Sequence, residues 1–271
     1  DHRDLHSFPT RRSSDLGAGQ IGCGAQAAVD PRKVTGSPSQ PTPAGPATPA
    51  IVVAIDGPAG VGKSTVARRL AARLGVPYVD TGAMYRATAL FLADRGIDPA
   101  DRAGVAAALR AMPLRLVLAD HGARVELAGL DPGPRLRLPE VSALTSRIAV
   151  HPEVRLRLVA LQQEFVRRHG GVMEGRDIGT VVAPETPFKF YLDAAPGVRA
   201  ERRHAELARQ GAASNQDEVA RQLAERDARD SSRRVSPLQP APDACQIDTG
   251  SLSPDEVVEA MLAEIRRRSG R

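Results

Sequence analysis

The chain has 271 residues, of which 42% are hydrophobic and 25% are charged, so it can build one or two folded domains and is not a disordered polymer. Its net charge of +5 is too small for a protein that coats DNA and suits a local site for an anionic substrate equally well. Two widely spaced cysteines, Cys23 and Cys245, exclude a disulfide framework and a paired-cysteine zinc site. Because no apolar run is long enough for a bilayer or a signal core, we expect a soluble, cytoplasmic protein without a membrane partner. We also expect a monomer without a nucleic-acid partner.

The N-terminal part, residues 1–49, differs in composition from the rest and is predicted to be a disordered tail or linker. Residues 37–49 are rich in Pro, Thr and Ala and cannot build a packed core. Residues 6–16 (HSFPTRRSSDL) read as one frame of a common sequencing-adapter oligonucleotide. We therefore interpret residues 1–16 as an artefact and predict no structural element for them. The alternative is an ordinary disordered tail.

Regular patterning begins at residue 51. Residues 51–55 (IVVAI) form a continuous apolar run with β-branched members, which is typical of a strand buried on both faces. A glycine-rich loop follows, and the apolar spacing over residues 64–74 predicts a helix that Gly75 ends. The alternating runs at 114–118 and 124–128, separated by His121 and Gly122, predict a hairpin.

The remaining elements follow the same rules. We expect further strands at 77–80, 171–175, 188–193 and 244–248, and further helices at 83–95, 100–112, 140–149, 152–168, 197–211, 216–230 and 254–268. Strands that alternate with helices predict an α/β fold with a mainly parallel central sheet flanked by helices. The hairpin and helices near 114–168 are predicted to be an insertion.

The glycine-rich loop fits the pattern Gly, four residues, Gly-Lys-Ser/Thr, between a predicted strand and a predicted helix. Glycines let successive N–H groups surround phosphate oxygens, and the helix N-terminus adds a positive dipole end. A lysine supplies a compact charge to the β- and γ-phosphates, and the next hydroxyl binds Mg²⁺. Only three of the 37 basic residues are Lys, so a Lys in this motif carries weight. The predicted ATP-binding residues are Gly57, Pro58, Ala59, Gly60, Val61, Gly62, Lys63, Ser64 and Thr65, with Ser64 as the metal ligand.

The other motifs favour a small kinase over other phosphate-loop proteins. A GTPase would need a guanine-reading Asn-Lys-x-Asp, and the chain has one Asn and no Asn-Lys pair. A mechanical ATPase is usually larger and carries an acidic pair after a long apolar strand. Transfer between two polyanions instead requires arginines, whose forked side chains bind phosphate oxygens in pairs. Four arginine-containing clusters lie at predicted element edges, at 81–86, 135–140, 174–177 and 226–233.

Each cluster can also be interpreted as a solvated or ion-paired surface without a functional role. Arg176 and Asp177 stand out because they follow a short apolar strand, and ligands of parallel sheets lie beyond the carboxyl ends of strands. The dense cluster at 226–233 is interpreted either as an ion-paired helix end or as a mobile lid that brings arginines onto the phosphates.

Taken together, the segments IDGPAGVGKST, DTGAMYR, EGRDIGTVV, FYLDA, ERDARDSSR and VSPL…IDT resemble the bacterial cytidylate kinases, in the family's order, over residues 51–271. The resemblance implies transfer of the γ-phosphoryl group of ATP to CMP or dCMP with Mg²⁺. It also implies the nucleoside monophosphate kinase fold: a phosphate-loop kinase domain with an enlarged monophosphate-binding insert at about 82–170 and a short lid at about 226–240.

By matching position, the resemblance implies roles for residues beyond the phosphate loop. Thr81 and Arg86 would contact the acceptor phosphate, and the insert would supply Arg137, or Arg135 if the alignment slips by two. Arg176 and Asp177 would read the cytosine end, and Glu174, where Asp is common, is assigned no role. Arg226 and Asp230 would hold the ribose and phosphates, with Arg233 at the lid. The catalytic cations would be Lys63, Arg176, Arg226, Arg229 and Arg233.

The predicted mechanism is in-line attack by an acceptor phosphate oxygen, without a general base because that phosphate is already anionic. Two alternatives remain at this point. The acceptor could be UMP, AMP or a non-nucleotide, or the chain could be a nucleotide-binding regulator without turnover. The complete set of Lys63, Ser64 and arginines favours the kinase, because a regulator has no need for two anion sites.

Overall fold

The computed structural model describes residues 51–271 except 121, 210 and 271, so the predictions for residues 1–49 and 1–16 lie outside the described residues. Its centre is a sheet of five strands in the order β2-β5-β1-β6-β7, with every neighbouring pair parallel. The predicted α/β class with a central parallel sheet is confirmed. The strands are β1 (Val52–Asp56), β2 (Tyr78–Asp80), β5 (Gly171–Gly175), β6 (Phe188–Asp193) and β7 (Cys245–Asp248).

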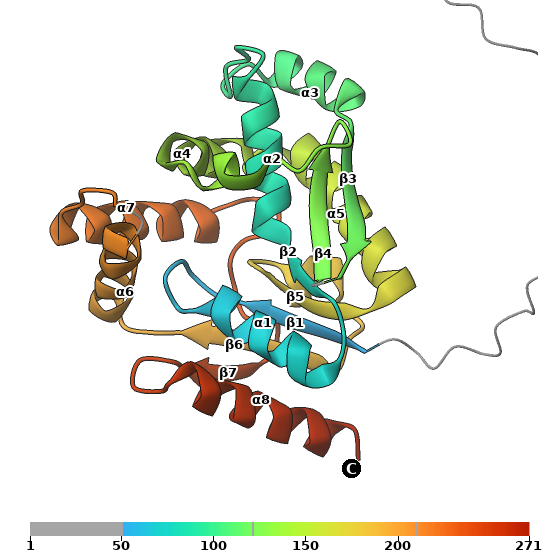
Figure 1. Cartoon of the computed structure of the whole chain (residues 1–271), viewed down its shortest axis with the longest axis vertical. Coiled ribbons are helices and arrows are strands. Elements are labelled where there is room, and N and C mark those ends of the chain that lie inside the picture. The colour runs from blue at the N-terminus through green and yellow to red at the C-terminus, as the bar shows by residue number, and fades with distance from the viewer. Residues whose placement is uncertain (1–50, 121, 210, 271) are drawn as a thin grey trace, which may run out of the picture. The chain divides into compact units, whose positions relative to one another are not determined.

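Helices cover both faces of this sheet (Figure 1). Along β1, Val53 and Ile55 join the core under α1 (Lys63–Leu74) and α8 (Pro254–Arg268), while Ala54 points into a second core on the other face, with residues of α5 (Pro152–His169). Alternation of side chains along a strand explains why a continuous apolar run is needed where both faces are buried.

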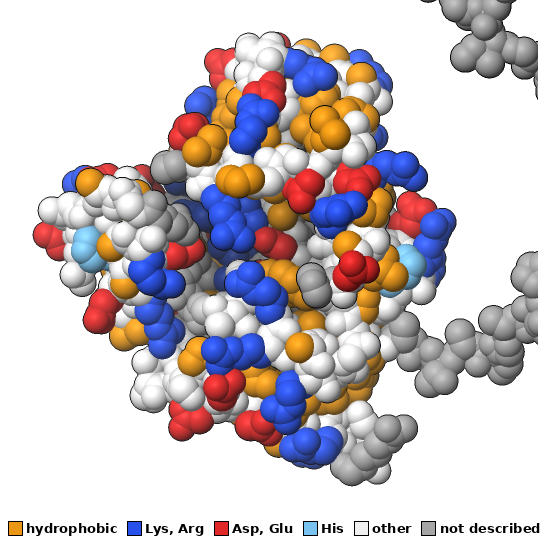
Figure 2. All heavy atoms as spheres, in the orientation of Figure 1, with side chains coloured by type: hydrophobic (Ala, Val, Ile, Leu, Met, Phe, Trp, Pro, Cys, Tyr) orange, Lys and Arg blue, Asp and Glu red, His pale blue; other side chains and the backbone are white. Residues whose placement is uncertain are grey.

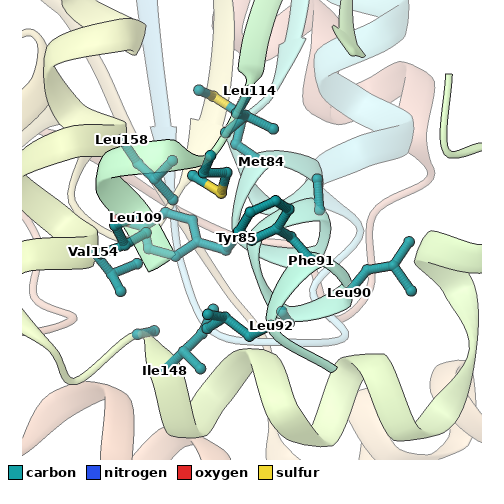
Figure 3. Packing of buried hydrophobic residues seen from close by; sticks show 14 of the residues in the cluster. Met84, Tyr85, Leu90, Phe91, Leu92, Leu109, Leu114, Ile148, Val154 and Leu158 are labelled. Carbon is teal, nitrogen blue, oxygen red and sulfur yellow. The ribbon is translucent and has the colours of Figure 1, made fainter. Parts of the chain in front are cut away.

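The predicted insertion has a hydrophobic core of its own (Figure 3). Met84, Leu109, Ile148 and Leu158 are among its buried members, contributed by four different helices. The hairpin forms a separate antiparallel sheet, as predicted. The elements are α2 (Thr81–Ala93), α3 (Arg102–Ala111), β3 (Leu114–Ala119), β4 (Gly122–Leu127), a 3₁₀ turn (Gly133–Arg137) and α4 (Pro139–Ile148), completed by α5.

Two helices, α6 (Pro196–Arg209) and α7 (Gln216–Ser231), pack against each other and, through Ala200 and Val219, against Ala59 of the phosphate loop. The segment predicted as a lid, at about 226–240, begins within α7, which ends at Ser231. In the described part of the chain, no helix has the length and apolar character needed to cross a membrane.

Two local features differ from the expectations. Helix α2 begins at Thr81 rather than residue 83, because the carboxylate of Asp80 accepts the N–H of Ala83 at 2.9 Å and caps the helix. After β5 the chain makes a π-helical turn, Ile178–Val182, where no element was predicted. Such a turn has no periodic sequence signature, and its first N–H groups bind Asp56 on another strand.

Candidate active site

The site lies beyond the carboxyl ends of β1, β2 and β5, where parallel strands deliver their following loops to one edge. Two cavities, of about 580 and 290 Å³, open there, and Lys63 lines both. Figure 2 shows Lys and Arg side chains gathered where the surface is hollowed between α6 and α7 and the rest of the molecule.

The phosphate loop has the backbone that its sequence predicts. Gly57, Gly60 and Gly62 all have positive φ, at 148°, 83° and 91°. A Cβ on Gly57 would lie 2.1 Å from the carbonyl oxygen of Leu192, so only glycine fits there. Gly62 is the N-cap of α1 and has no side chain to occupy the free N–H groups of the first turn, which leaves them for an anion.

Lys63 is buried, and its Nζ donates to the carbonyl of Pro58 at 2.5 Å, so the side chain lies over its own loop. Burial, with the positive charge of Arg176 next, lowers the pKa of Lys63 well below its usual value. The negative charge of an arriving phosphate would oppose both effects and favour the charged lysine. The ammonium group therefore lies where a bound phosphate would supply the anionic partner that it does not have among the described residues.

Glu174, to which the sequence assigned no role, lies beside Lys63 at the end of β5. Its carboxylate accepts a hydrogen bond from the hydroxyl of Tyr78 and lies near the hydroxyl of Ser64. Burial, with the charge of Asp80 next, raises the pKa of Glu174. A carboxylate and a hydroxyl are the hard oxygen donors that Mg²⁺ prefers, so Ser64 and Glu174 fit this ion. A single Glu near the end of a strand gave no sequence signal for this position.

The larger cavity extends from the phosphate loop to a region that sequence reasoning missed. Arg202 of α6 donates to the carbonyl of Thr249 at 2.6 Å, and the Thr249 hydroxyl donates to the carbonyl of Val61 at 3.1 Å. The segment between β7 and α8 is thereby tied to the phosphate loop. Thr249 ends the IDT segment, which was the sequence signal available for this region. The cavity lining also includes Arg203, Arg209 and Leu252.

The smaller cavity is lined by basic side chains from six separate segments. Arg86 of α2 pairs with Asp80 at 2.7 Å, and Arg137 lies in the same cavity. Arg135 instead pairs with Asp94 at 2.6 Å on the exposed surface. Of the two arginines that the sequence left open, Arg137 is the one at the cavity. The other basic side chains of this lining are Lys63, Arg68, Arg176, Arg203 and Arg226.

Asp230 of α7 is the carboxylate around which three of the predicted arginines meet. It is 2% exposed; its Oδ2 lies 2.9 Å from Nε of Arg176 and 3.9 Å from Nε of Arg226, and Arg233 binds its Oδ1. Burial, followed by the charges of Arg176 and Arg86, lowers the pKa of Arg226 to about 9. Like charges held this close favour the binding of an anion.

Asp177 lies in a third, smaller cavity and forms a buried ion pair with Arg155 of α5. Arg155 was missed because it follows Val154 on a helix whose inward face was assigned to apolar residues. Its guanidinium also lies 5.6 Å from the ring centre of Tyr85. This cavity, of about 60 Å³, is further lined by Thr81, Thr145 and Ser146.

One predicted catalytic residue lies apart from the others. Arg229 is exposed, and its Nε donates to the carbonyl of Glu225 one turn earlier at 3.2 Å. It lines a further cavity with Arg102, Arg233 and Arg234. The reason is that adjacent helical residues do not face each other: Arg229 points away from its neighbour Asp230, the carboxylate that binds Arg176 and Arg233.

A strand, a glycine-rich loop and a helix that together hold an anion site, facing a second site lined with arginine, define a phosphate-loop kinase. The comparisons identify its family. The sequence model of the cytidylate kinase family matches residues 53–267, and the chain belongs to this family.

Three curated relatives illustrate the match. The cytidylate kinase of Corynebacterium efficiens is 46% identical over 213 residues, which cover 78% of this chain and 93% of the relative. That of Mycobacterium leprae is 44% identical over 221 residues, covering 81% and 97%. That of Carboxydothermus hydrogenoformans is 41% identical over 217 residues, covering 80% and 98%.

Proposed function

We propose that the protein is a kinase that transfers the γ-phosphoryl group of ATP to CMP or dCMP, giving ADP and CDP or dCDP. The observation that carries this proposal is that Lys63 lines two cavities at once: one built on the phosphate loop and one lined with arginines. Two polyanions brought to opposite sides of one lysine are what phosphoryl transfer requires.

In this proposal the larger cavity takes ATP. The N–H groups of residues 57–65 surround its phosphates, and the base end lies toward Arg202 and Thr249. Ser64 and Glu174 would hold Mg²⁺, which neutralises charge on the β- and γ-phosphates when bound.

The smaller cavities take the acceptor. Arg86 and Arg137 contact its phosphate, while Arg226 and Asp230 hold the ribose and phosphates. The base lies at the Arg155–Asp177 pair: the exocyclic amine of cytosine donates to a carboxylate, and its ring nitrogen and carbonyl accept from a guanidinium. Thr81 and Ser146 line the same end, and the Thr81 hydroxyl is held by the carbonyl of Glu174 at 2.6 Å.

Transfer then proceeds by in-line attack of an acceptor phosphate oxygen on the γ-phosphorus, with ADP leaving on the far side. The attacking oxygen is already anionic, so the chain's residues bind, orient and neutralise rather than remove a proton. Lys63, Arg176 and Arg226 stabilise the charge that spreads over the transferred group.

The domain boundaries are part of the same proposal. The insert at about 82–170 has its own core, which supports its treatment as an acceptor-binding unit. The segment at about 226–240 acts as the lid, since Arg226 and Arg233 lie on it. The same proposal includes a monomer that acts in the cytoplasm, where ATP and CMP occur.

The test is ADP production by the purified protein with ATP and Mg²⁺, comparing CMP, dCMP, UMP and AMP at equal concentrations. We expect strong turnover with CMP or dCMP and little with AMP. Turnover that prefers AMP, or ATP binding without turnover on any acceptor, would overturn the proposal in favour of another acceptor or a regulator.

A further inference from the structure

Asp56, the last residue of β1, is a buried carboxylate that none of the proposed steps uses. It is 4% exposed and lies one residue before the phosphate loop. Both of its oxygens bind backbone groups of a different segment: Oδ1 accepts the N–H of Ile178, and Oδ2 accepts the N–H of Gly179, each at 2.8 Å.

These two N–H groups begin the π-helical turn that follows Arg176 and Asp177. The first N–H groups of any helical turn have no partner within the turn and need an acceptor from outside. Within the described part of the chain, the adjoining Asp177 does not cap the turn with its own side chain. Asp56 therefore supplies the cap from a neighbouring strand.

The consequence of this arrangement is that Asp177 keeps its carboxylate for Arg155. The backbone at Arg176 is held at the same time, and its side chain reaches Asp230. A turn that was capped by Asp177 itself, as a helix commonly is, would withdraw that carboxylate from the base end of the acceptor cavity.

We propose that Asp56 is a positioning residue for acceptor recognition: its two oxygens hold the turn at Ile178 and Gly179 so that Arg176 and Asp177 present their side chains to the acceptor. The proposal rests on the acceptor site assigned above. Asp56 lies on the strand that leads into the phosphate loop, but in this proposal it affects the binding of the acceptor rather than the binding of ATP.

The burial of this carboxylate supports a specific role. Burial raises the pKa of Asp56 to about 6, even though both hydrogen bonds act in the opposite direction. Ala54, on the same face of β1, packs in a hydrophobic core. An apolar residue at position 56 would therefore avoid the free-energy cost of burying a carboxylate. The charged and titratable groups around Asp56 are Asp177, Lys63, Arg176, Tyr191 and, beyond Gly179, Lys189.

The test is Asp56→Asn, compared with Asp193→Asn as a matched control. Asp193 also ends a strand of this sheet, but its carboxylate accepts from its own neighbour Ala194 at 2.8 Å. The amide of Asn can accept only one of the two N–H groups and opposes the other. We expect the KM for CMP to rise about tenfold, the loss of one hydrogen bond to a charged group, with the KM for ATP changed less than about twofold.

A second readout is hydrogen exchange at the amides of Ile178 and Gly179, which should accelerate in Asp56→Asn and not in Asp193→Asn. A third is the ratio of kcat/KM for CMP between wild type and Asp56→Asn. Because both proteins share the titration of the substrate phosphate, this ratio isolates Asp56 and should approach one as the pH falls below about 6.

If Asp56→Asn does not fold, Gly179→Ala tests the same contact from the other side. A Cβ there would lie 3.4 Å from Oδ2 of Asp56 and 3.3 Å from the side chain of Lys189, so it tightens this contact and requires a shift of a few tenths of an ångström between the turn and its neighbours. An equal rise in both KM values, or faster exchange with an unchanged KM for CMP, overturns the proposal. Failure of the acceptor assignment is recognised separately, because then Asp177→Asn also leaves the KM for CMP unchanged.

Discussion

Arg176 and Asp230 lie 54 residues apart in the chain, yet Nε of the first donates to Oδ2 of the second at 2.9 Å. One residue follows strand β5, next to the central strand β1, and the other lies near the end of α7. The ion pair links the base end of the acceptor cavity to the segment that we assign to the lid. Removal of either partner leaves a buried charge uncompensated, so the two residues are coupled both in stability and in acceptor binding.

Lys63→Ala should lower kcat by about 10²-fold or more, because a cation aimed at the transferred phosphate is lost from a buried site. The fold should persist, since the Nζ of Lys63 donates to a carbonyl of its own loop. ADP production and thermal unfolding measure the two effects. Arg69→Ala is the control, because Arg69 lies on the same helix and pairs with Asp255 at the surface. Normal turnover in Lys63→Ala would rule out this site.

Asp230→Ala should raise the KM for CMP by about tenfold or more while the KM for ATP changes little, since a carboxylate that binds a substrate hydroxyl and orders arginines is lost. The variant should also lose about 3 kcal/mol of unfolding free energy, because Arg176 and Arg233 are left without their buried partner. Steady-state kinetics and denaturant unfolding test both. Equal weakening of ATP and CMP would contradict the assignment.

Arg137→Ala and Arg135→Ala form a matched pair that tests the insert. Arg137 lines the acceptor cavity, so its loss should raise the KM for CMP about tenfold, as for other charge-assisted phosphate contacts. Arg135 pairs with Asp94 on an exposed surface, so its loss should leave the kinetics unchanged. The reverse pattern would restore the alternative alignment.

Asp177→Asn should reduce the preference for CMP over UMP about tenfold, because an amide can donate to the uracil carbonyl where a carboxylate can only accept. Arg155 would remain without its anionic partner, so a lower unfolding temperature should accompany the change. Competition between CMP and UMP in one reaction measures the preference directly. An unchanged preference would show that the base lies elsewhere.

The stability of the protein should reflect the pKa of Asp56, which is raised in the folded state to about 6 from 3.8. Between these values the folded protein binds more protons than the unfolded chain, so this group stabilises the fold as the pH falls and destabilises it as the pH rises. From pH 7 to pH 4, wild type should gain about 1 to 3 kcal/mol relative to Asp56→Asn. Denaturant unfolding of both proteins across that range tests the sign, and a constant difference would contradict it.

Local patterns were sufficient for much of the fold. The apolar run before the glycine-rich loop, the apolar spacing of α1 and the alternation of β3 and β4 predicted elements that the structure contains within a few residues. The π-helical turn after β5 escaped prediction because Asp56, far away in sequence, caps it.

The sequence by itself determined the phosphate loop, because Gly57, Gly62, Lys63 and Ser64 act through local backbone geometry and adjacent spacing. Only the tertiary structure decided which arginines face the substrates. It brought Arg137 to the cavity and Arg135 to the surface, and it supplied Arg155 from a helix whose sequence predicted packing. The physical reason is that a local motif carries its own geometry, whereas an ion pair depends on which distant segments the folded core places side by side.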